Sequence, residues 1–465
     1  MRKGDMRDIC KGVYWVFLIG FVLKSSAYAA VVVPKVNCLS INAYMDKIVA
    51  LKKHGNYREV TPTAKSRYFD YQSLPSFSEY LAFTRQKIAA LNPKAHMPCP
   101  LETAVTEKYL SNAIENRIVV DLIQPFEVVP QNASTVIVLL HGLTDSPFVF
   151  HDIADQLYQQ GYAVRTMLLP GHATAPADLI NAKVEDWQIM AEYSVRRALK
   201  DYKKVYLGGF STGGALLIDQ LLSNKLANAE LKRIRGLLLW SPASKAKSDF
   251  SWAAQYVDYI PFFDYLAKGA DIDIAKYESF PINAGAQVHQ LMTTISAKRE
   301  RFDNQPDIPV FTVASDVDTT ISTEATIALL ARWHNNKNRQ TKTQDHLMYF
   351  GREKLLNKLP SSFKVTISQC RDKSYCGRLM DIAHTATTNA PTNSYYGVNG
   401  VYRNCQHISD DKQFNLCKTR TNNFFGEITA DNLAKKPAMQ RLTFNPQFDE
   451  MIGLMNQFLI KTNKN

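Results

Sequence analysis

Glycine and proline are scarce in this chain of 465 residues, with 20 of each. That is too few for a collagen-like or low-complexity chain. Hydrophobic residues make up 46% and charged residues 21%, which is close to the globular average and excludes wholesale disorder and coiled coil. A mean hydropathy of −0.23 argues against a polytopic membrane protein. The length therefore predicts two or three domains, or one large α/β domain with additions.

The first 29 residues carry the longest apolar run, Gly12–Leu23, and it is too short to span a bilayer. Lys and Arg precede this run, and Ala27-Tyr28-Ala29 follows it. A basic start, a short apolar centre and an A-x-A end are typical of a secretory signal peptide. We therefore expect an exported protein, periplasmic or secreted, cleaved near Ala29. An uncleaved anchor and a buried first helix are the alternatives.

The net charge is +12, and part of it belongs to this leader. Residues 1–29 contain five Lys or Arg and two Asp, so their removal leaves +9. The remaining chain has no dense Lys/Arg block interleaved with aromatic residues, and nucleic acid is therefore not an expected partner. The charge fits weak attraction to anionic membrane surfaces, or simply the solvated basic face of a soluble protein.

Cysteine is also rare, and no C-x-x-C or close Cys/His set exists to hold zinc. Beyond the leader six cysteines remain, an even number that suggests disulfides in an oxidising compartment. Six cysteines allow fifteen pairings. The simplest joins sequence neighbours, namely Cys38–Cys99, Cys370–Cys376 and Cys405–Cys417.

The pattern of apolar and polar residues changes near residue 116. Residues 30–115 show helical periodicity, as at 41–53 and 76–91, and predict a small helical extension. Residues 116–465 alternate short apolar runs with amphipathic segments. This alternation predicts an α/β fold with a mostly parallel central sheet covered by helices on both faces. Strands are expected at 136–142, 163–171, 204–211, 234–243, 308–316 and 363–368, and helices at 146–161, 184–202, 212–224 and 322–334.

The alternation stops at about 244–305. This stretch is rich in Trp, Tyr and Phe, and we expect no strand in it. An aromatic insertion after a sheet strand suits a helical cap over a site at the carboxyl edge of the sheet, although a helical layer without ligand contact would give the same pattern.

The most specific motif is Gly209-Phe210-Ser211-Thr212-Gly213, a G-x-S-x-G between a predicted strand and a predicted helix. A sharp strand-to-helix turn strains the serine and needs small neighbours, so the hydroxyl of Ser211 projects at the top of the sheet. The alternative is a plain glycine-rich turn. We take Ser211 as a candidate nucleophile.

A serine nucleophile needs a base and an acid that orients it, in the chain order Ser, acid, His on this type of sheet. Asp318 follows the strand 308–316 and extends beyond its end, with Asp316 as the alternative. His384 follows the last predicted strand, whereas His346 precedes it. We therefore expect Asp318 and His384 to be catalytic, with His346 as the alternative base.

The tetrahedral intermediate of acyl transfer also needs backbone N–H donors. Thr212 directly follows the nucleophile, and Leu143 follows the strand that ends in His141-Gly142. We expect Leu143 and Thr212 to form the oxyanion hole. His141 and His172 are expected to be structural.

The segments HGLTDSPF, LPGHATAP, GFSTGG, SDVDTTI and IAHT occur in this order and resemble the α/β-hydrolase superfamily. The resemblance is to its carboxylesterase and monoacylglycerol-lipase-like members with a short cap. It implies a Ser211–Asp318–His384 triad, with Leu143 and Thr212 as oxyanion donors. The N-terminal extension, the cysteine-bearing segment before His384 and the segment 385–444 depart from the family pattern.

These observations predict an exported serine esterase or lipase that acts on a small-molecule acyl ester or lipid with an apolar acyl group, without metal or cofactor. A thioesterase or peptidase with the same triad is the alternative. A non-catalytic binding protein would lack one of the three residue types, and all three are present.

Overall fold

The computed structural model describes residues 37–40, 69–247, 264–269, 271–297, 302–303 and 305–463. The predicted signal peptide and the helix predicted at 41–53 lie outside these residues. All described residues fall in one compact unit, Val36–Asn465. No helix among them is long and apolar enough to cross a membrane.

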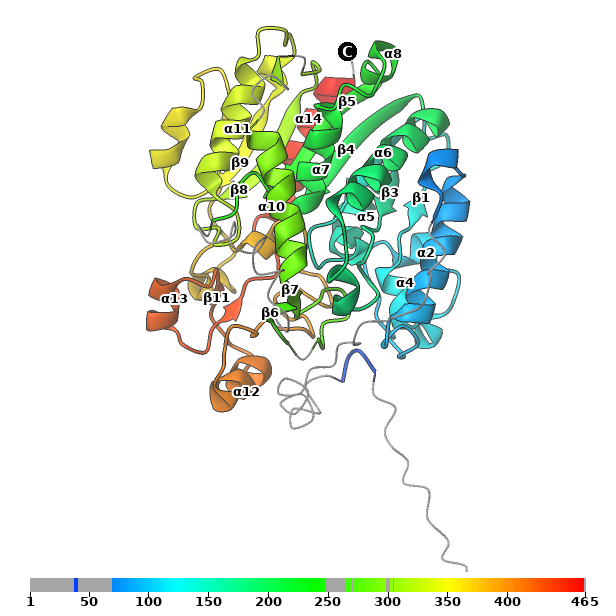
Figure 1. Ribbon diagram of the computed structural model, residues 1–465. Helices are drawn as coiled ribbons and strands as arrows, with labels where there is room; N and C mark the ends of the chain where they lie inside the picture. Colours follow the sequence, from blue (N-terminus) through cyan, green and yellow to red (C-terminus); the bar gives the residue numbers. More distant parts are fainter. Residues whose placement is uncertain are drawn as a thin grey trace, which may run out of the picture. The chain divides into compact units, whose positions relative to one another are not determined.

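An eight-stranded sheet forms the centre of this unit (Figure 1). The two-residue edge strand β1 pairs antiparallel with β3, and the other neighbouring strands pair parallel. The strand order is β1 (Glu127–Val128), β3 (Ala163–Met167), β2 (Thr135–Leu140), β4 (Lys204–Phe210), β5 (Ile234–Trp240), β8 (Val310–Ser315), β9 (His346–Phe350) and β10 (Lys364–Ile367).

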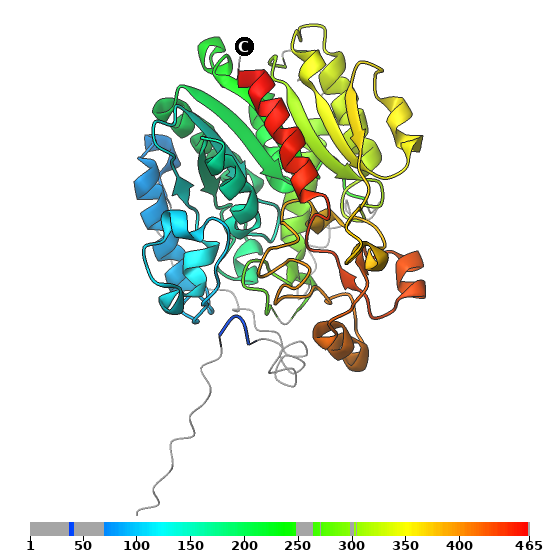
Figure 2. The ribbon, with the colours of Figure 1, turned by 180° about the vertical axis from the view of Figure 1, so that it is seen from behind.

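The predicted α/β architecture with a mostly parallel sheet is confirmed, because helices cover both faces of the sheet. Alternate residues of β2 enter two different cores: Val136 and Val138 pack with one helical layer, and Ile137 and Leu139 with the other. The first layer contains α6 (Val184–Asp201), α7 (Thr212–Leu221), α10 (Ile282–Ala297) and α11 (Thr323–Asn335). The second layer contains α5 (His151–Gln159) and α14 (Phe448–Asn463). Figure 2 shows the side of the sheet that carries α14, in red.

The sequence-based prediction was wrong in three details. Two strands of the central sheet, β1 and β9, were missed. The insertion does contain strands, since β6 (Tyr265–Ala267) pairs with β7 (Phe280–Pro281). The helix predicted from residue 146 begins with a 3-10 turn, Pro147–Phe150, and the Ser146 side chain makes no capping hydrogen bond there.

In the N-terminal region the helix α2 (Phe77–Leu91) forms as predicted, with Ser76 and Glu79 in a capping box at its start. Its side chains Phe77 and Tyr80 join the same core as α6 and α7. The Tyr80 hydroxyl also accepts a hydrogen bond from the backbone N–H of Leu168 at 2.8 Å. This helix therefore packs directly on the sheet-bearing unit.

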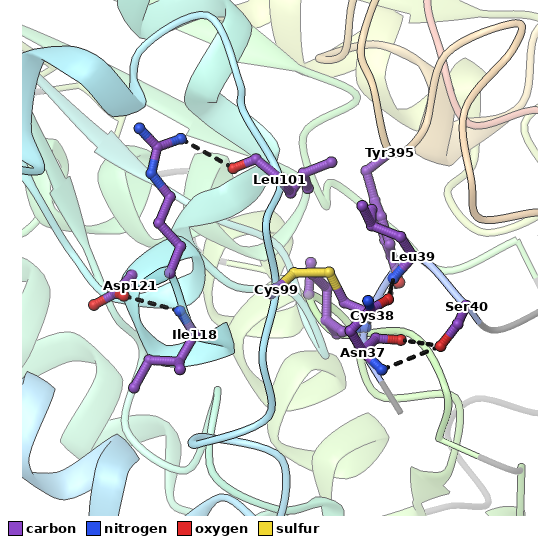
Figure 3. The surroundings of a disulfide bond; sticks show 12 residues. Asn37, Cys38, Leu39, Ser40, Cys99, Leu101, Ile118, Asp121 and Tyr395 are labelled. Carbon is purple, nitrogen blue, oxygen red and sulfur yellow. Dashed lines mark hydrogen bonds between the residues drawn. A yellow bond between two sulfur atoms is a disulfide. The ribbon is translucent and has the colours of Figure 1, made fainter. Parts of the chain in front are cut away.

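The structure contains three disulfides with the neighbour pairing that the sequence suggested: Cys38–Cys99, Cys370–Cys376 and Cys405–Cys417. Figure 3 shows the first of them, beside Tyr395 and a turn in which the Ser40 hydroxyl donates to the Asn37 carbonyl at 2.9 Å. Both cysteines are fully buried. They share a third core with Tyr395 and the Cys405–Cys417 bond, so residues 37–40 are packed against the segment that follows His384.

Candidate active site

Several strands end at one edge of the sheet, and the candidate residues meet there. A cavity of about 1010 Å³ opens at this edge and is lined by Leu143, Ser211, Thr212 and His384 among others. In parallel sheets ligands bind outside the carboxyl ends of the strands, and the volume suits a small organic substrate.

Ser211 occupies the turn between β4 and α7. Its backbone angles are φ 50° and ψ −115°, a strained conformation for a residue with a side chain. The flanking glycines are required by space: a Cβ on Gly209 would collide with the backbone of Gly213 and Gly214, and one on Gly213 with the Leu140 carbonyl. The geometry is that of a nucleophile elbow.

The structure brings Ser211, His384 and Asp318 into one hydrogen-bonded chain. The imidazole Nδ1 of His384 lies 2.6 Å from Asp318 Oδ2, and its Nε2 lies 3.0 Å from the Ser211 hydroxyl. A carboxylate can only accept, so Nδ1 carries the proton and Nε2 accepts from the serine. All three side chains are buried. This arrangement can transfer the serine proton to the imidazole.

The alternative acid and base lie elsewhere. Asp316 accepts a hydrogen bond from the backbone N–H of Arg352 at 3.0 Å. His346 is the first residue of β9, and its Nε2 lies 2.9 Å from the Thr366 hydroxyl. Neither side chain shares a hydrogen bond with Ser211 or His384 in the described part of the chain.

The proposed oxyanion donors border the same cavity. Thr212 is the first residue of α7, where a backbone N–H has no partner within the helix. Leu143 follows β2 and lines the cavity. The positive end of the α7 dipole is directed at this point, and a developing negative charge would be stabilised there.

In the described part of the chain, the imidazoles of His141 and His172 have hydrogen-bond contacts with backbone groups of nearby loops. His141 Nε2 accepts from the backbone N–H of Leu169 at 3.1 Å, so its Nδ1 carries the proton shared with the Gly142 carbonyl. Burial lowers the pKa of His141 well below its ordinary value. Burial likewise lowers the pKa of His172 to about 4. Both imidazoles stay neutral and shape the loops beside the cavity.

One functional contact was missed by the sequence analysis. Lys276 forms an ion pair with the buried Asp145, with Nζ 2.5 Å from Oδ1. The next residue, Tyr277, donates its backbone N–H to the Thr144 carbonyl at 2.9 Å. The insertion thus fixes the loop that carries Leu143. No local signal marks this pair, because its members are far apart in the chain.

The cavity has two chemically different walls. Apolar residues of α10 and its surroundings form one wall, and polar residues of the segment after His384 form part of another. The first comprises Phe280, Ile282, Val288 and Met292, and the second Tyr402, Asn404, Gln406 and Arg441. Among the described residues there is no group of three or more His, Cys, Asp or Glu that could hold a metal ion.

Known proteins match part of the chain. Residues 131–262 match the family described as serine aminopeptidase, S33. A thermostable monoacylglycerol lipase from Bacillus sp. (strain H-257) is 23% identical over 171 residues, which are 37% of this chain and 67% of that protein.

Solved structures resemble about half of the chain. The monoacylglycerol lipase of Paleococcus ferrophilus is 18% identical, covering 49% of this chain and 88% of its own, with a TM-score of 0.39. A soluble variant of the monoglyceride lipase of Saccharomyces cerevisiae, in complex with a substrate analogue, is 13% identical, covering 53% and 81%, with a TM-score of 0.39. The family match and the bacterial relative confirm the resemblance to the α/β-hydrolase superfamily that was drawn from the motifs.

Proposed function

We propose that the protein is a serine hydrolase that cleaves carboxylic esters through a covalent acyl-enzyme. The observation that carries this proposal is the hydrogen-bonded chain from Ser211 through His384 to Asp318, at an elbow that faces a cavity. The similarity to the thermostable monoacylglycerol lipase of Bacillus sp. (strain H-257) supports an ester substrate.

The reaction follows from the geometry. His384 Nε2 takes the proton of Ser211 as the hydroxyl oxygen attacks the acyl carbonyl, while Asp318 holds the imidazolium in place. The N–H groups of Leu143 and Thr212 receive the oxyanion, and donors of this kind contribute about 10²–10³ each to kcat. His384 then protonates the departing alcohol. Water, activated by the same imidazole, attacks the acyl-enzyme and releases the acid.

The apolar wall along α10 is the proposed acyl site. Val288 and Met292 are buried and border the cavity, whereas the wall built by Asn404 and Gln406 offers hydrogen bonds to a polar leaving group. An ester with an apolar acyl chain and a polar alcohol would contact both walls.

The direct test is labelling with a fluorophosphonate probe, followed by mapping of the modified peptide. Label on Ser211 in the native protein and its loss in Ser211→Ala are expected, with turnover of p-nitrophenyl esters reduced by several orders of magnitude in the variant. Label on another residue, or full turnover by the variant, would refute the proposal.

A second variant tests the acyl site. Val288→Trp fills part of the apolar wall, and its ratio of octanoate to acetate hydrolysis should fall at least tenfold relative to the native enzyme. Acetate turnover should change little, because the reacting groups are untouched. An unchanged ratio would place the acyl chain elsewhere.

Hydrolysis of a peptide bond at a chain end is the second candidate, and the family description, serine aminopeptidase, favours it. The triad chemistry would be the same, so only the substrate distinguishes the two. Aminoacyl anilides and acyl thioesters measured beside the p-nitrophenyl esters decide the matter. Higher kcat/KM for the anilides would replace the esterase proposal with a peptidase.

Export and weak membrane association are also proposed. They are motivated by the leader-like residues 1–29, the paired cysteines and the positive charge. Expression with and without residues 1–29, followed by N-terminal sequencing of the exported protein, tests cleavage near Ala29. Co-sedimentation with anionic and neutral vesicles tests the membrane surface.

A further inference from the structure

A completely buried carboxylate, Glu427, lies behind the two loops that carry Asp318 and His384. Its Oε2 accepts the backbone N–H of His384 at 3.0 Å and that of Thr319 at 3.5 Å. Its Oε1 accepts the backbone N–H of Ile428 at 2.8 Å. One side chain thus holds the backbone next to the proposed acid and the backbone of the proposed base.

An arginine completes this arrangement. Arg441 donates from Nε to Oε1 of Glu427 at 2.7 Å and from Nη2 to Oε2 at 3.0 Å. Its Nη2 also lies 2.9 Å from the Thr320 hydroxyl, two residues after Asp318. The two-point pair therefore fixes the orientation of the carboxylate and ties it a second time to the Asp318 loop.

The local chain path explains why Glu427 reaches this place. The strand β11 (Phe425–Gly426) runs beside the residues that lead into His384: the backbone N–H of Met380 donates to the Phe425 carbonyl at 2.9 Å, and that of Glu427 donates to Asp381 at 2.6 Å. The approach is so close that a Cβ on Gly426 would lie 2.8 Å from both Met380 and Asp381 side-chain atoms.

The charge state of Glu427 is set by these neighbours. Burial alone would raise the pKa of its carboxyl, but the Arg441 charge and the hydrogen bonds outweigh burial and leave the pKa at about 2. The side chain is therefore an anion over the whole range in which an imidazole base works. A buried anion that loses its donors is costly, so it holds them firmly.

We propose that Glu427 is a positioning residue for hydrolysis. It holds the loops of Asp318 and His384 in a fixed position relative to each other by accepting hydrogen bonds from their backbone N–H groups. This inference rests on the proposed function of Ser211, Asp318 and His384. Asp318 and His384 are 66 residues apart in the chain, so their loops must be brought together by tertiary contacts. A displacement of about 1 Å at a reacting group can cost 10²-fold in rate, which is why a common anchor matters.

Two substitutions separate this role from general stability. Glu427→Gln keeps the size but replaces an acceptor with an NH₂ group that faces N–H donors. Glu427→Asp keeps the charge and a partner for Arg441, but the shorter side chain no longer reaches the His384 N–H. The matched control is Asp345→Asn, which alters another fully buried carboxylate with a two-point arginine partner, Arg339, before β9 and away from the cavity.

Kinetics and melting temperature are measured for all variants, with p-nitrophenyl butyrate as substrate. Both Glu427 variants are expected to lose about 10- to 100-fold in kcat with KM within about threefold, and to react with a fluorophosphonate more slowly by a similar factor. Asp345→Asn is expected to melt earlier with kcat within about twofold of the native value. If Glu427→Gln does not fold, the comparison of Glu427→Asp with Asp345→Asn decides the outcome.

The inference is overturned if the Glu427 variants melt earlier yet keep kcat within twofold, as the control does, or if only KM changes. This result differs from a failure of the proposed function. In that case the native enzyme and Ser211→Ala would already show the same activity and the same labelling.

Discussion

Substitution of Asp318 by Asn tests the acid assignment most sharply, because the structure fixes which way the new amide must face. Asp318 Oδ1 accepts the backbone N–H groups of Thr320 and Ile321 at 2.8 and 2.7 Å, and Oδ2 accepts His384 Nδ1–H. In the variant the amide oxygen stays with the two N–H donors. The NH₂ group then faces Nδ1, which must accept, and the proton of the imidazole moves to Nε2.

An imidazole protonated at Nε2 cannot take the proton of Ser211. We therefore expect kcat to fall about 10⁴-fold, or about 5 kcal/mol in barrier height, with little change in KM. Steady-state hydrolysis of a p-nitrophenyl ester measures the effect, and near-native melting confirms that the variant folds.

Asp316→Asn is the matched control for this experiment. Asp316 accepts from the backbone of Arg352 and not from His384, so its variant should stay within about twofold of native kcat. If Asp318→Asn kept more than a tenth of the native kcat, or if Asp316→Asn lost as much, the acid would be misassigned.

Two further predictions concern stability. Replacing Cys38 and Cys99 by Ser opens a loop with a sequence separation of 61 and should lower the free energy of unfolding by about 4 kcal/mol. The same replacement of Cys370 and Cys376, whose separation is 6, should lower it by about 2 kcal/mol. Urea unfolding of the two double variants compares these losses, and equal losses would contradict the loop-length argument. Burial, and then neighbouring lysines, lower the pKa of His346 to about 4, so the imidazole is neutral in the folded chain and its stabilising effect is lost as pH falls from 6.5 toward 4. In His346→Gln the fall in unfolding free energy between pH 7 and pH 4 should be smaller by about 3 kcal/mol, and an unchanged fall would refute this.

The central fold could be predicted because its signals are local. Apolar runs separated by amphipathic segments identify buried parallel strands, and the glycines around Ser211 identify a turn whose close contacts admit no side chain. The proximity of Asp318 and His384 followed from the chain order expected for this sheet rather than from the residues between them.

The missed features depend on contacts between distant segments. The five residues of β9, HLMYF, form a short apolar run, and only its pairing with β8 and β10 identifies it as a strand of the sheet. The strands β6 and β7 are only three and two residues long, and each is extended because it pairs with the other. Lys276 and Glu427 are ordinary charged residues in the sequence, and only the folded chain pairs them with Asp145 and Arg441.

The last helix has a consequence for the order in which a growing polypeptide acquires its structure. The strand β4, which leads into Ser211, is tied to α14 by the Tyr206 hydroxyl, 2.8 Å from that of Thr462. A nascent chain emerging from the ribosome therefore carries its serine elbow long before the helix that backs it has been synthesised. The packing of α14 on β4 is therefore a late step of folding, because a contact between such distant segments forms only after both have been synthesised.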